Sequence, residues 1–465
     1  MTIENAADHS ELSPLKPSIK IGWAIGELAI AAFVVLQMAF MLFYCTQALG
    51  LEPAIAGVAL LIPRILDAFA DPMMGAISDR TNHKFGRRRI YLLFGAPLLG
   101  LSFASIFFIP HTAPTEVKFI LLVGSFFLSN LAVTLYEVPY SAMAAEMTQS
   151  YKERTVLAGY KMFAARAAGV AVVFAAPMIF GSQADLQTGF KVLGVAAGLF
   201  MAITGLWTFF SSKNAPRIDF SVAKFSIRDE IDAVIHNQSF RRLWSAFFAQ
   251  NLAIGVSATA QIYFITIVMS VAPKDIGHFL VAGSLAALVA TPLWVLVGRK
   301  IGKQKGYLFG ILAAAILTVP AFFLSPAQLA WLVPILILAG IIDAANQLFP
   351  NAMIPDTVEM DELRSGQRRE GAIFGAWGFA RKLGMTGGAF LVSIMLSVIG
   401  FIPGAATELQ SADALNGIRY IYAGVPLLLW LLTMLLFSRY DLNEAKFEQA
   451  KRDISERKLH KLNEN

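Results

Sequence analysis

The sequence predicts an all-α membrane protein, because of its composition and its long apolar runs. Of its 465 residues, 56% are hydrophobic and only 15% are charged, whereas a soluble domain carries about 25% charged residues. Twelve apolar runs reach the length of about 20 residues that a helix needs to cross a bilayer. No segment alternates between polar and apolar residues as the strands of a membrane barrel do.

The twelve runs form two sets of six, separated by a polar and basic stretch. We predict a terminal segment over 1–20, a six-helix bundle over 21–212, a central loop over 213–242, a second bundle over 243–438 and a tail over 439–465. The spacing of apolar residues at 225–235 favours a short surface helix, and the tail is either a surface helix or disordered. The runs lie at 21–49, 53–77, 90–109, 119–145, 156–180, 189–210, 243–271, 276–297, 307–324, 329–354, 372–402 and 420–437.

An internal repeat relates the two halves. Asp71-Pro72 precedes a basic link in the first half, and Thr291-Pro292 precedes a basic link in the second. Two related halves of six helices are typical of the major facilitator fold, so we predict that fold with two six-helix pseudo-repeats. Only the first half has an acid before its proline, so we expect the chemistry that is special to this protein in the first half.

Basic residues are concentrated in every second link between the runs. The links at 78–89, 298–306 and 364–369 are rich in Lys and Arg, whereas those at 50–52 and 325–327 have none. Since cytoplasmic loops carry the excess of positive charge, we expect both termini in the cytoplasm and the chain in a bacterial inner membrane. The first residues lack the pattern of a cleaved signal peptide, and the single cysteine, Cys45, excludes a disulfide framework.

Three ionisable residues share one face of the second run. Arg64, Asp67 and Asp71 stand three and four residues apart, which makes them neighbours on a helix. Each such group costs about 2.5–3.5 kcal/mol inside a membrane helix on insertion scales, so it needs a function or a partner. Two carboxylates and one guanidinium leave a net negative charge, which suits Na⁺ or a proton. The alternatives are a structural ion-pair network and a helix distortion at Asp71-Pro72.

The fourth run carries another acid, Glu137, with Thr134 one turn earlier on the same face. Pro139 frees a backbone carbonyl one turn back. This part of the helix thus supplies carboxylate, hydroxyl and carbonyl oxygens, which are the ligands that an alkali ion needs. The alternative is a structural pair between Glu137 and Arg166. We predict a cation site, with Na⁺ held by the three carboxylates, that consists of Asp67, Asp71, Thr134 and Glu137.

Further polar residues lie on several runs near aromatic rings. Hydrogen-bonding groups beside a flat apolar face suit a sugar or another polyol. For each amide, the alternative is an ordinary hydrogen bond between helices, and Lys382 also has the charge to pair with the acids of the first half. The predicted substrate-binding residues are Glu27, Tyr140, Arg166, Asn251, Gln347, Asn351, Trp377 and Lys382.

The basic link after the second run has a pattern of its own. Asp79-Arg80 is followed by Gly86 and three successive arginines. Its position at the expected cytoplasmic end favours a charge latch that holds the outward-open state, and the alternative is that these charges only orient the chain in the membrane. The predicted gating residues are Arg64, Asp79, Arg80, Arg87 and Arg88.

These motifs resemble the signature of the glycoside–pentoside–hexuronide:cation symporters, the melibiose permease-like family of the major facilitator superfamily. The resemblance implies a cation site from the four residues named above, with Lys382 nearby, and a sugar site with acids on helices one and four and an arginine on helix five. It is carried by Arg64-x-x-Asp67-x-x-x-Asp71-Pro72 with Asp79-Arg80-Thr81, by Glu137-Val-Pro-Tyr-Ser141, and by Gly366-Gln367-Arg368 with Lys382-Leu383-Gly384.

The sequence departs from the melibiose type at three sugar-binding positions. Leu28 replaces the acid of helix one, Ser141 replaces an aromatic residue of helix four, and Met162 lies near the position of the helix-five arginine. We therefore expect a substrate other than a galactoside. Glu137 replaces a shorter aspartate, which leaves Na⁺ and H⁺ both open as the coupling ion.

We expect a symporter, not an enzyme, that moves a sugar or glycoside with Na⁺ or H⁺ by alternating access. It would act as a monomer in the bilayer, need no cofactor besides the coupling ion and bind no nucleic acid. The absence of a phosphate-binding glycine loop argues against ATP-driven transport. The first alternative is a cation-coupled transporter of lysolipids or other amphipathic solutes, and the second is an uncoupled facilitator or a non-transporting sensor.

Overall fold

The computed structural model describes residues 15–148, 150–216, 232, 234–366, 369–442, 446–450, 452–454 and 456. Within these ranges the chain is helical and contains no strand. Twelve of the described helices are long and apolar enough to cross a membrane. The predicted all-α class is confirmed, and the chain is a multi-pass membrane protein. Most of the predicted surface helix at 225–235 and much of the predicted tail lie outside the described residues.

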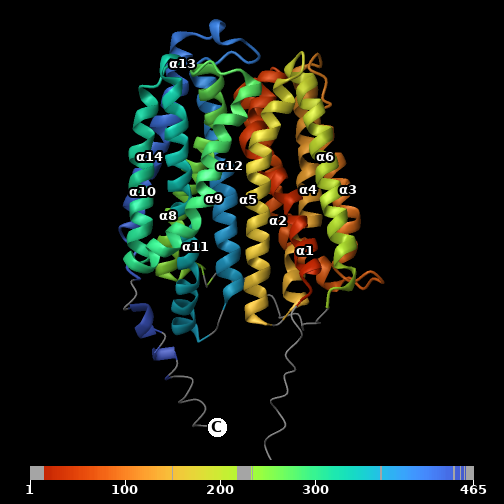
Figure 1. Ribbon diagram of the computed structural model, residues 1–465, viewed down its shortest axis with the longest axis vertical. Helices are drawn as coiled ribbons and strands as arrows, with labels where there is room; N and C mark the ends of the chain where they lie inside the picture. Colours follow the sequence, from red (N-terminus) through yellow and green to blue (C-terminus); the bar gives the residue numbers. More distant parts are fainter. Residues whose placement is uncertain are drawn as a thin grey trace, which may run out of the picture. The chain divides into compact units, whose positions relative to one another are not determined.

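The helices follow the apolar runs of the sequence, and Figure 1 labels them. In each half, the first helix ends in a π-helical turn, as expected for equivalent helices of two repeats. The first half contains α1 (Pro17–Phe43) with its turn η1 (Tyr44–Ala48), α2 (Pro53–Arg80), α3 (Arg89–Ile106), α4 (Thr115–Met147), α5 (Tyr151–Gly181) and α6 (Leu186–Ser211). The second half contains α8 (Gln238–Tyr263) with its turn η3 (Phe264–Val268), α9 (Ile276–Ile301), α10 (Lys303–Thr318), α11 (Leu332–Ser365), α12 (Glu370–Val398), the short α13 (Ala412–Arg419) and α14 (Val425–Phe437).

The chain divides into two compact units. The first unit comprises Met1–Gln37 and Ile62–Ala223, and the second comprises Met38–Leu61 and Lys224–Asn465. The end of α1, η1 and the start of α2 therefore belong to the second unit, where the hydroxyls of Thr46 and Tyr263 lie 2.7 Å apart. The backbone N–H of Ala54 also donates a hydrogen bond of 2.8 Å to Ser397 Oγ. The domain boundaries expected from the sequence stay a prediction.

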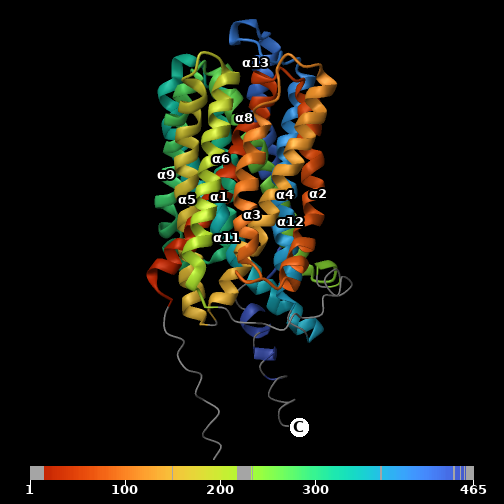
Figure 2. The ribbon, with the colours of Figure 1, turned by 90° about the vertical axis from the view of Figure 1, so that its right-hand side faces the viewer.

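In the first unit, α3 and α6 lie side by side (Figure 2) and approach closely through glycines. A Cβ atom added to Gly100 would come within 2.3 Å of the carbonyl oxygen of Gly198, and the reverse distance is 2.4 Å. Small residues allow membrane helices to pack backbone against backbone in this way. Next to this contact, Phe107, Phe190 and Phe180 form a stack of rings. The first unit is thus a tightly packed scaffold for the polar residues of α2, α4 and α5.

The core of the second unit is aromatic, with one buried polar bridge. The rings of Phe247 and Trp377 stack with their centroids 3.7 Å apart. Gln250 accepts a hydrogen bond of 2.6 Å from the Tyr307 hydroxyl and donates one of 2.9 Å to the carbonyl of Asn346. Because buried polar groups are costly unless they are paired, this bridge ties α8 to α10 and α11.

The glycine contact between α3 and α6 gives a test of the fold. We expect Gly198→Ala to lower the free energy of unfolding by about 1–3 kcal/mol, because the added methyl overlaps the facing backbone. Gly124→Ala on α4 is the matched control, since a Cβ there meets no atom within 4 Å. The control should be neutral or slightly stabilising, because Ala favours helix over Gly. Thermal unfolding in detergent measures both, and equal shifts would contradict the packing.

Candidate cation and substrate sites

The centre of the first unit holds two aspartates around one hydroxyl. Thr134 Oγ1 of α4 lies 2.7 Å from Asp67 Oδ1 and 3.1 Å from Asp71 Oδ1 of α2. The i, i+4 spacing on α2 places both carboxylates on the face that meets α4, and Asp67 is only 4% exposed. One hydroxyl has one proton, so it donates to only one of the two carboxylates at a time. The three oxygens are hard ligands that converge on one point.

Arg64 lies beside these acids. Arg64 Nη1 lies 3.9 Å from Asp67 Oδ2, and Arg64 interacts electrostatically with Asp67, Asp71 and Glu137. Three ionised carboxylates and one guanidinium have a net charge of minus two. Within the described residues, no three His, Cys, Asp or Glu side chains are arranged to hold a metal ion. The structure thus brings Asp67, Asp71 and Thr134 together and leaves Glu137 outside that tight group.

A second charged group of the first unit connects α1 with α5. Lys161 Nζ lies 3.4 Å from Glu27 Oε2 and donates a hydrogen bond of 3.0 Å to Ser141 Oγ. It also lies 5.3 Å from the ring centroid of Tyr140, and that ring stacks on Trp23 at 5.0 Å. We did not predict Lys161 as a site residue. The signal was a lysine inside an apolar run, which requires an acidic partner.

Tyr140 lies between the two charged groups of the first unit. It interacts electrostatically both with Glu27 and with Glu137. Its hydroxyl is buried and has no hydrogen-bond partner within the described residues, although buried tyrosine hydroxyls usually have one. The predicted residue Arg166 is half-buried on α5, five positions after Lys161. The tyrosine thus provides a polar atom next to both acids.

In the second unit, three predicted substrate residues come together. Trp377 Nε1 donates a hydrogen bond of 2.9 Å to Asn351 Oδ1, and Asn351 Nδ2 donates one of 2.6 Å to the carbonyl of Gln347. Asn251 lies apart from them: it is 1% exposed, and its amide donates to the carbonyl of Phe247 in its own helix. Lys382 is half-buried on α12, five residues beyond Trp377. The substrate-binding roles of these residues stay predictions.

The predicted gating residues of the basic link form ion pairs within the first unit. Arg88 Nη2 lies 2.6 Å from Asp79 Oδ1, and Arg87 forms an ion pair with Glu146 at the end of α4. Arg88 Nε also lies 3.4 Å from Glu146. The sequence analysis missed Glu146, which is an acid at the expected cytoplasmic end of the fourth run, facing a link of arginines. Arg80 is exposed, and within the described chain it forms no hydrogen bond or ion pair.

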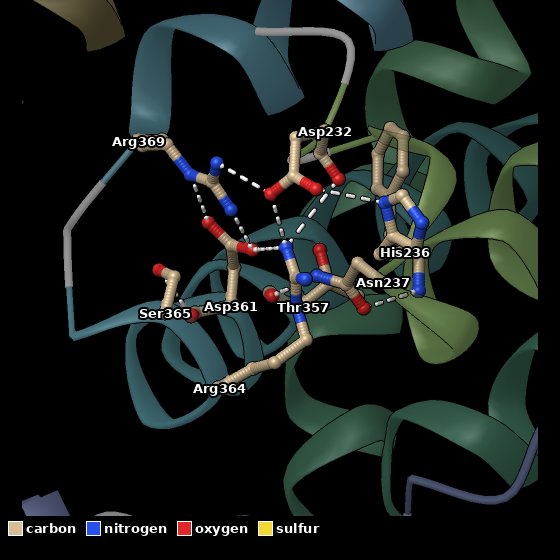
Figure 3. Close-up of polar contacts among 9 residues, drawn as sticks. Asp232, His236, Asn237, Thr357, Asp361, Arg364, Ser365 and Arg369 are labelled. Carbon is tan, nitrogen blue, oxygen red and sulfur yellow. Dashed lines mark hydrogen bonds and ion pairs between the residues drawn. The ribbon is translucent and has the colours of Figure 1, made fainter. Parts of the chain in front are cut away.

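A second cluster of charges surrounds a buried carboxylate in the second unit (Figure 3). Asp361, which is 0% exposed, accepts hydrogen bonds of 2.8 and 2.7 Å from Arg369 and one of 3.1 Å from Arg364. Both arginines also bond to Asp232 at 2.9 Å, and His236 Nδ1 lies 2.8 Å from that carboxylate. The sequence analysis assigned these arginines only a topological role and missed both acids.

The hydrogen bonds from Arg364 and Arg369 lower the pKa of Asp232 to about 2. A carboxylate whose pKa is lower in the folded state stabilises the fold above its unfolded pKa. The contribution of Asp232 is therefore complete near neutral pH and is lost as the pH falls from about 4 toward 2. The cluster fixes residue 232 to α11 and to the start of α12 under physiological conditions.

The fold and these charged groups define a secondary transporter of the major facilitator type. A model of the family described as MFS/sugar transport protein matches residues 22–444. The chain therefore belongs to that family, the glycoside–pentoside–hexuronide:cation symporters, and the resemblance found in the sequence is confirmed. Members of this family are transporters, not enzymes.

Similar proteins are known in sequence and in structure. The uncharacterized symporter YnaJ of Bacillus subtilis (strain 168) is 29% identical over 455 residues, 94% of each chain. The putative glycoside/cation symporter YagG of Escherichia coli (strain K12) is 26% identical over 438 residues, again 94% of each. The crystal structure of a D-xylose-proton symporter matches with a TM-score of 0.64 over 92% of this chain and 98% of that chain, at 16% identity. That likeness shows the shared fold.

The buried carboxylate of the second cluster gives a test. We expect Asp361→Asn to lower the free energy of unfolding by roughly 3–5 kcal/mol, because it removes the buried counter-charge of Arg369. Asp232→Asn should have a much smaller effect, since solvent-exposed ion pairs contribute little. Thermal unfolding of the purified protein at neutral pH measures both. Equal effects of the two variants would show that Asp361 does not organise the cluster.

Proposed function

We propose that this protein is a secondary symporter that couples the entry of a sugar or glycoside to that of Na⁺ or H⁺. The observation that carries the proposal is the net negative cluster of Asp67, Asp71, Glu137 and Arg64 on membrane helices. Carboxylates in a low-dielectric environment favour the binding of a cation, so this cluster suits a coupling ion. The relative YagG is described as a putative glycoside/cation symporter, which is consistent with this proposal.

We assign the binding site of the coupling ion in this proposal to the two aspartates. Carboxylate and hydroxyl oxygens of Asp67, Asp71 and Thr134 are the ligands that a hard cation prefers. The same carboxylates accept a proton if the ion is H⁺. Glu137 adds negative charge and competes for Arg64. Binding of the cation frees part of the guanidinium charge and changes the field at Tyr140, next to Glu27.

The substrate is best explained as a polyol. Around Tyr140 the first unit offers two aromatic rings, a carboxylate and an ammonium group from Trp23, Glu27 and Lys161. In the second unit, Asn351, Gln347 and Trp377 offer amides beside an indole. Carboxylates, amides and aromatic faces bind sugar hydroxyls and the apolar faces of sugar rings. Alternating access then follows from the dependence of the two conformations on the bound cation.

Uptake into proteoliposomes tests the coupling. We expect the wild-type protein to accumulate a substrate from a glycoside panel only when a Na⁺ or a pH gradient is imposed. Asp71→Asn and Glu137→Gln should reduce uptake to the equilibrium level, because each removes one negative charge that the cation neutralises. Exchange of labelled for unlabelled substrate should persist in part. Full accumulation by either variant would refute the proposed coupling.

Thr134 supplies a matched pair of variants for the same experiment. Thr134→Ser keeps the oxygen that lies between the aspartates, whereas Thr134→Val removes it with little change of shape. Loss of one polar partner of an ion is worth about 1.5 kcal/mol, so the valine variant should need roughly tenfold more cation for half-maximal uptake. The serine variant should resemble the wild type. Identical cation dependence of the two variants would place the ion elsewhere.

We also propose that both termini face the cytoplasm, because the basic links then follow the positive-inside rule. Cys45 is buried, so single cysteines introduced at exposed positions report the topology. On intact cells, His111→Cys between α3 and α4 should react with a membrane-impermeant maleimide, whereas Lys305→Cys on α10 should react only after lysis. The reverse pattern would invert the orientation.

A further inference from the structure

A buried amide on α4 of the first unit has an oxygen atom without a donor. Asn130 is 1% exposed, and its Nδ2 donates a hydrogen bond of 2.8 Å to the carbonyl of Phe126 in the same helix. This bond fixes which end of the amide is the oxygen, because two acceptors would repel each other at that distance. Asn130 Oδ1 accepts no hydrogen bond within the described residues, which is costly for a buried acceptor.

A buried donor on α2 has no acceptor either. Arg64 Nη2 makes no hydrogen bond within the part of the chain that the structure describes. Arg64 Nη1 lies 3.9 Å from Asp67 Oδ2, which is too long for a hydrogen bond. The guanidinium is therefore attracted by Asp67, Asp71 and Glu137 through their charges, without a hydrogen bond to any of them.

The contacts between α2 and α4 show that these helices run in the same direction. Thr134 on α4 lies against Asp67 and Asp71 on α2. Four residues beyond Thr134 and Asp71, a Cβ atom added to Gly75 would lie 3.9 Å from a methyl carbon of Val138. Residues at i, i+4 spacing on one helix thus face residues at the same spacing on the other.

The same register brings the amide and the guanidinium to one level of the first unit. Asn130 precedes Thr134 by four residues, and Arg64 precedes Asp67 by three. Both residues therefore lie one turn before the contact of Thr134 with Asp67, on the facing sides of α4 and α2. A donor without an acceptor is thus opposite an acceptor without a donor.

We propose that Asn130 is a positioning residue that takes up Arg64 while the coupling cation occupies the two aspartates. This inference rests on the proposed symport. Before the cation binds, the carboxylates attract the guanidinium. The bound cation weakens that attraction, and Arg64 Nη2 then donates to Asn130 Oδ1. A neutral amide suits this role, because it accepts the hydrogen bond without a charge that would hold the arginine permanently.

The cation dependence of uptake into proteoliposomes tests the inference, with NaCl and pH varied in separate series. Asn130→Ala should raise the cation concentration for half-maximal uptake about tenfold, which is the effect of one hydrogen bond to a charged group. The maximal rate at saturating cation should remain near that of the wild type. Asn130→Asp should lower the half-maximal concentration, because a carboxylate binds Arg64 more firmly. A purely structural amide would make both variants worse.

A second measurement shows whether Asn130 acts through Arg64. Thermal unfolding of the purified protein at increasing cation concentration reports cation affinity without transport. Arg64→Met keeps an unbranched side chain and removes the donors. In this background Asn130→Ala should leave the cation affinity unchanged, because the amide then has no arginine to take up. An effect of Asn130→Ala that persists with Arg64→Met would overturn the inference.

Ser129→Ala is the matched control. Ser129 is the buried neighbour of Asn130 on α4, and its hydroxyl also has no partner within the described residues. This variant should show the cation dependence of the wild type. If the wild type depends on the cation and Asn130→Ala shows the same dependence, the inference is wrong and the proposed symport stands. Accumulation by the wild type without any cation gradient would instead refute the symport, and this inference with it.

Discussion

The Thr134 hydroxyl lies between Asp67 and Asp71. Arg64 interacts electrostatically with these two acids and with a third, Glu137. Inside membrane helices, such a charge imbalance is expensive. In the same unit, α3 and α6 meet through the close contact of Gly100 with Gly198, and α3 also packs on α4. In the proposed coupling, a bound cation neutralises part of this imbalance. This constraint links the stability of the first unit to its proposed coupling role.

The same unit contains a connection between the proposed cation site and the proposed substrate site. Glu137 and Thr134 lie on α4 three residues apart, and Tyr140 follows three residues later. Tyr140 interacts with Glu137 on one side and with Glu27 on the other. Its stack on Trp23 and the ammonium group of Lys161 above its ring fix the aromatic plane. Tyr140 thus lies between the proposed cation site and residues that are proposed to bind the substrate.

The sequence predicts the helices and the shared face of Asp67 and Asp71, because length, hydropathy and i, i+4 spacing are local properties, whereas Thr134 is joined to them through the resemblance to the family. It does not predict which helix faces which. The pair of Glu27 with Lys161 and the pair of Arg87 with Glu146 depend on the rotation of packed helices. The sequence analysis did not identify Asp361 for a related reason. This residue follows an apolar run as an ordinary acid, and only tertiary packing buries it completely.

The two units differ at the position before the repeated proline of their second helices. Where the first has Asp71, the second has Thr291, whose hydroxyl donates to the carbonyl of Ala287 in its own helix. The buried amide of Gln250 is fully bonded to Tyr307 and Asn346. Neutral, paired groups of this kind stabilise a bundle and respond little to ions. This difference supports the proposal that the coupling ion binds in the first unit.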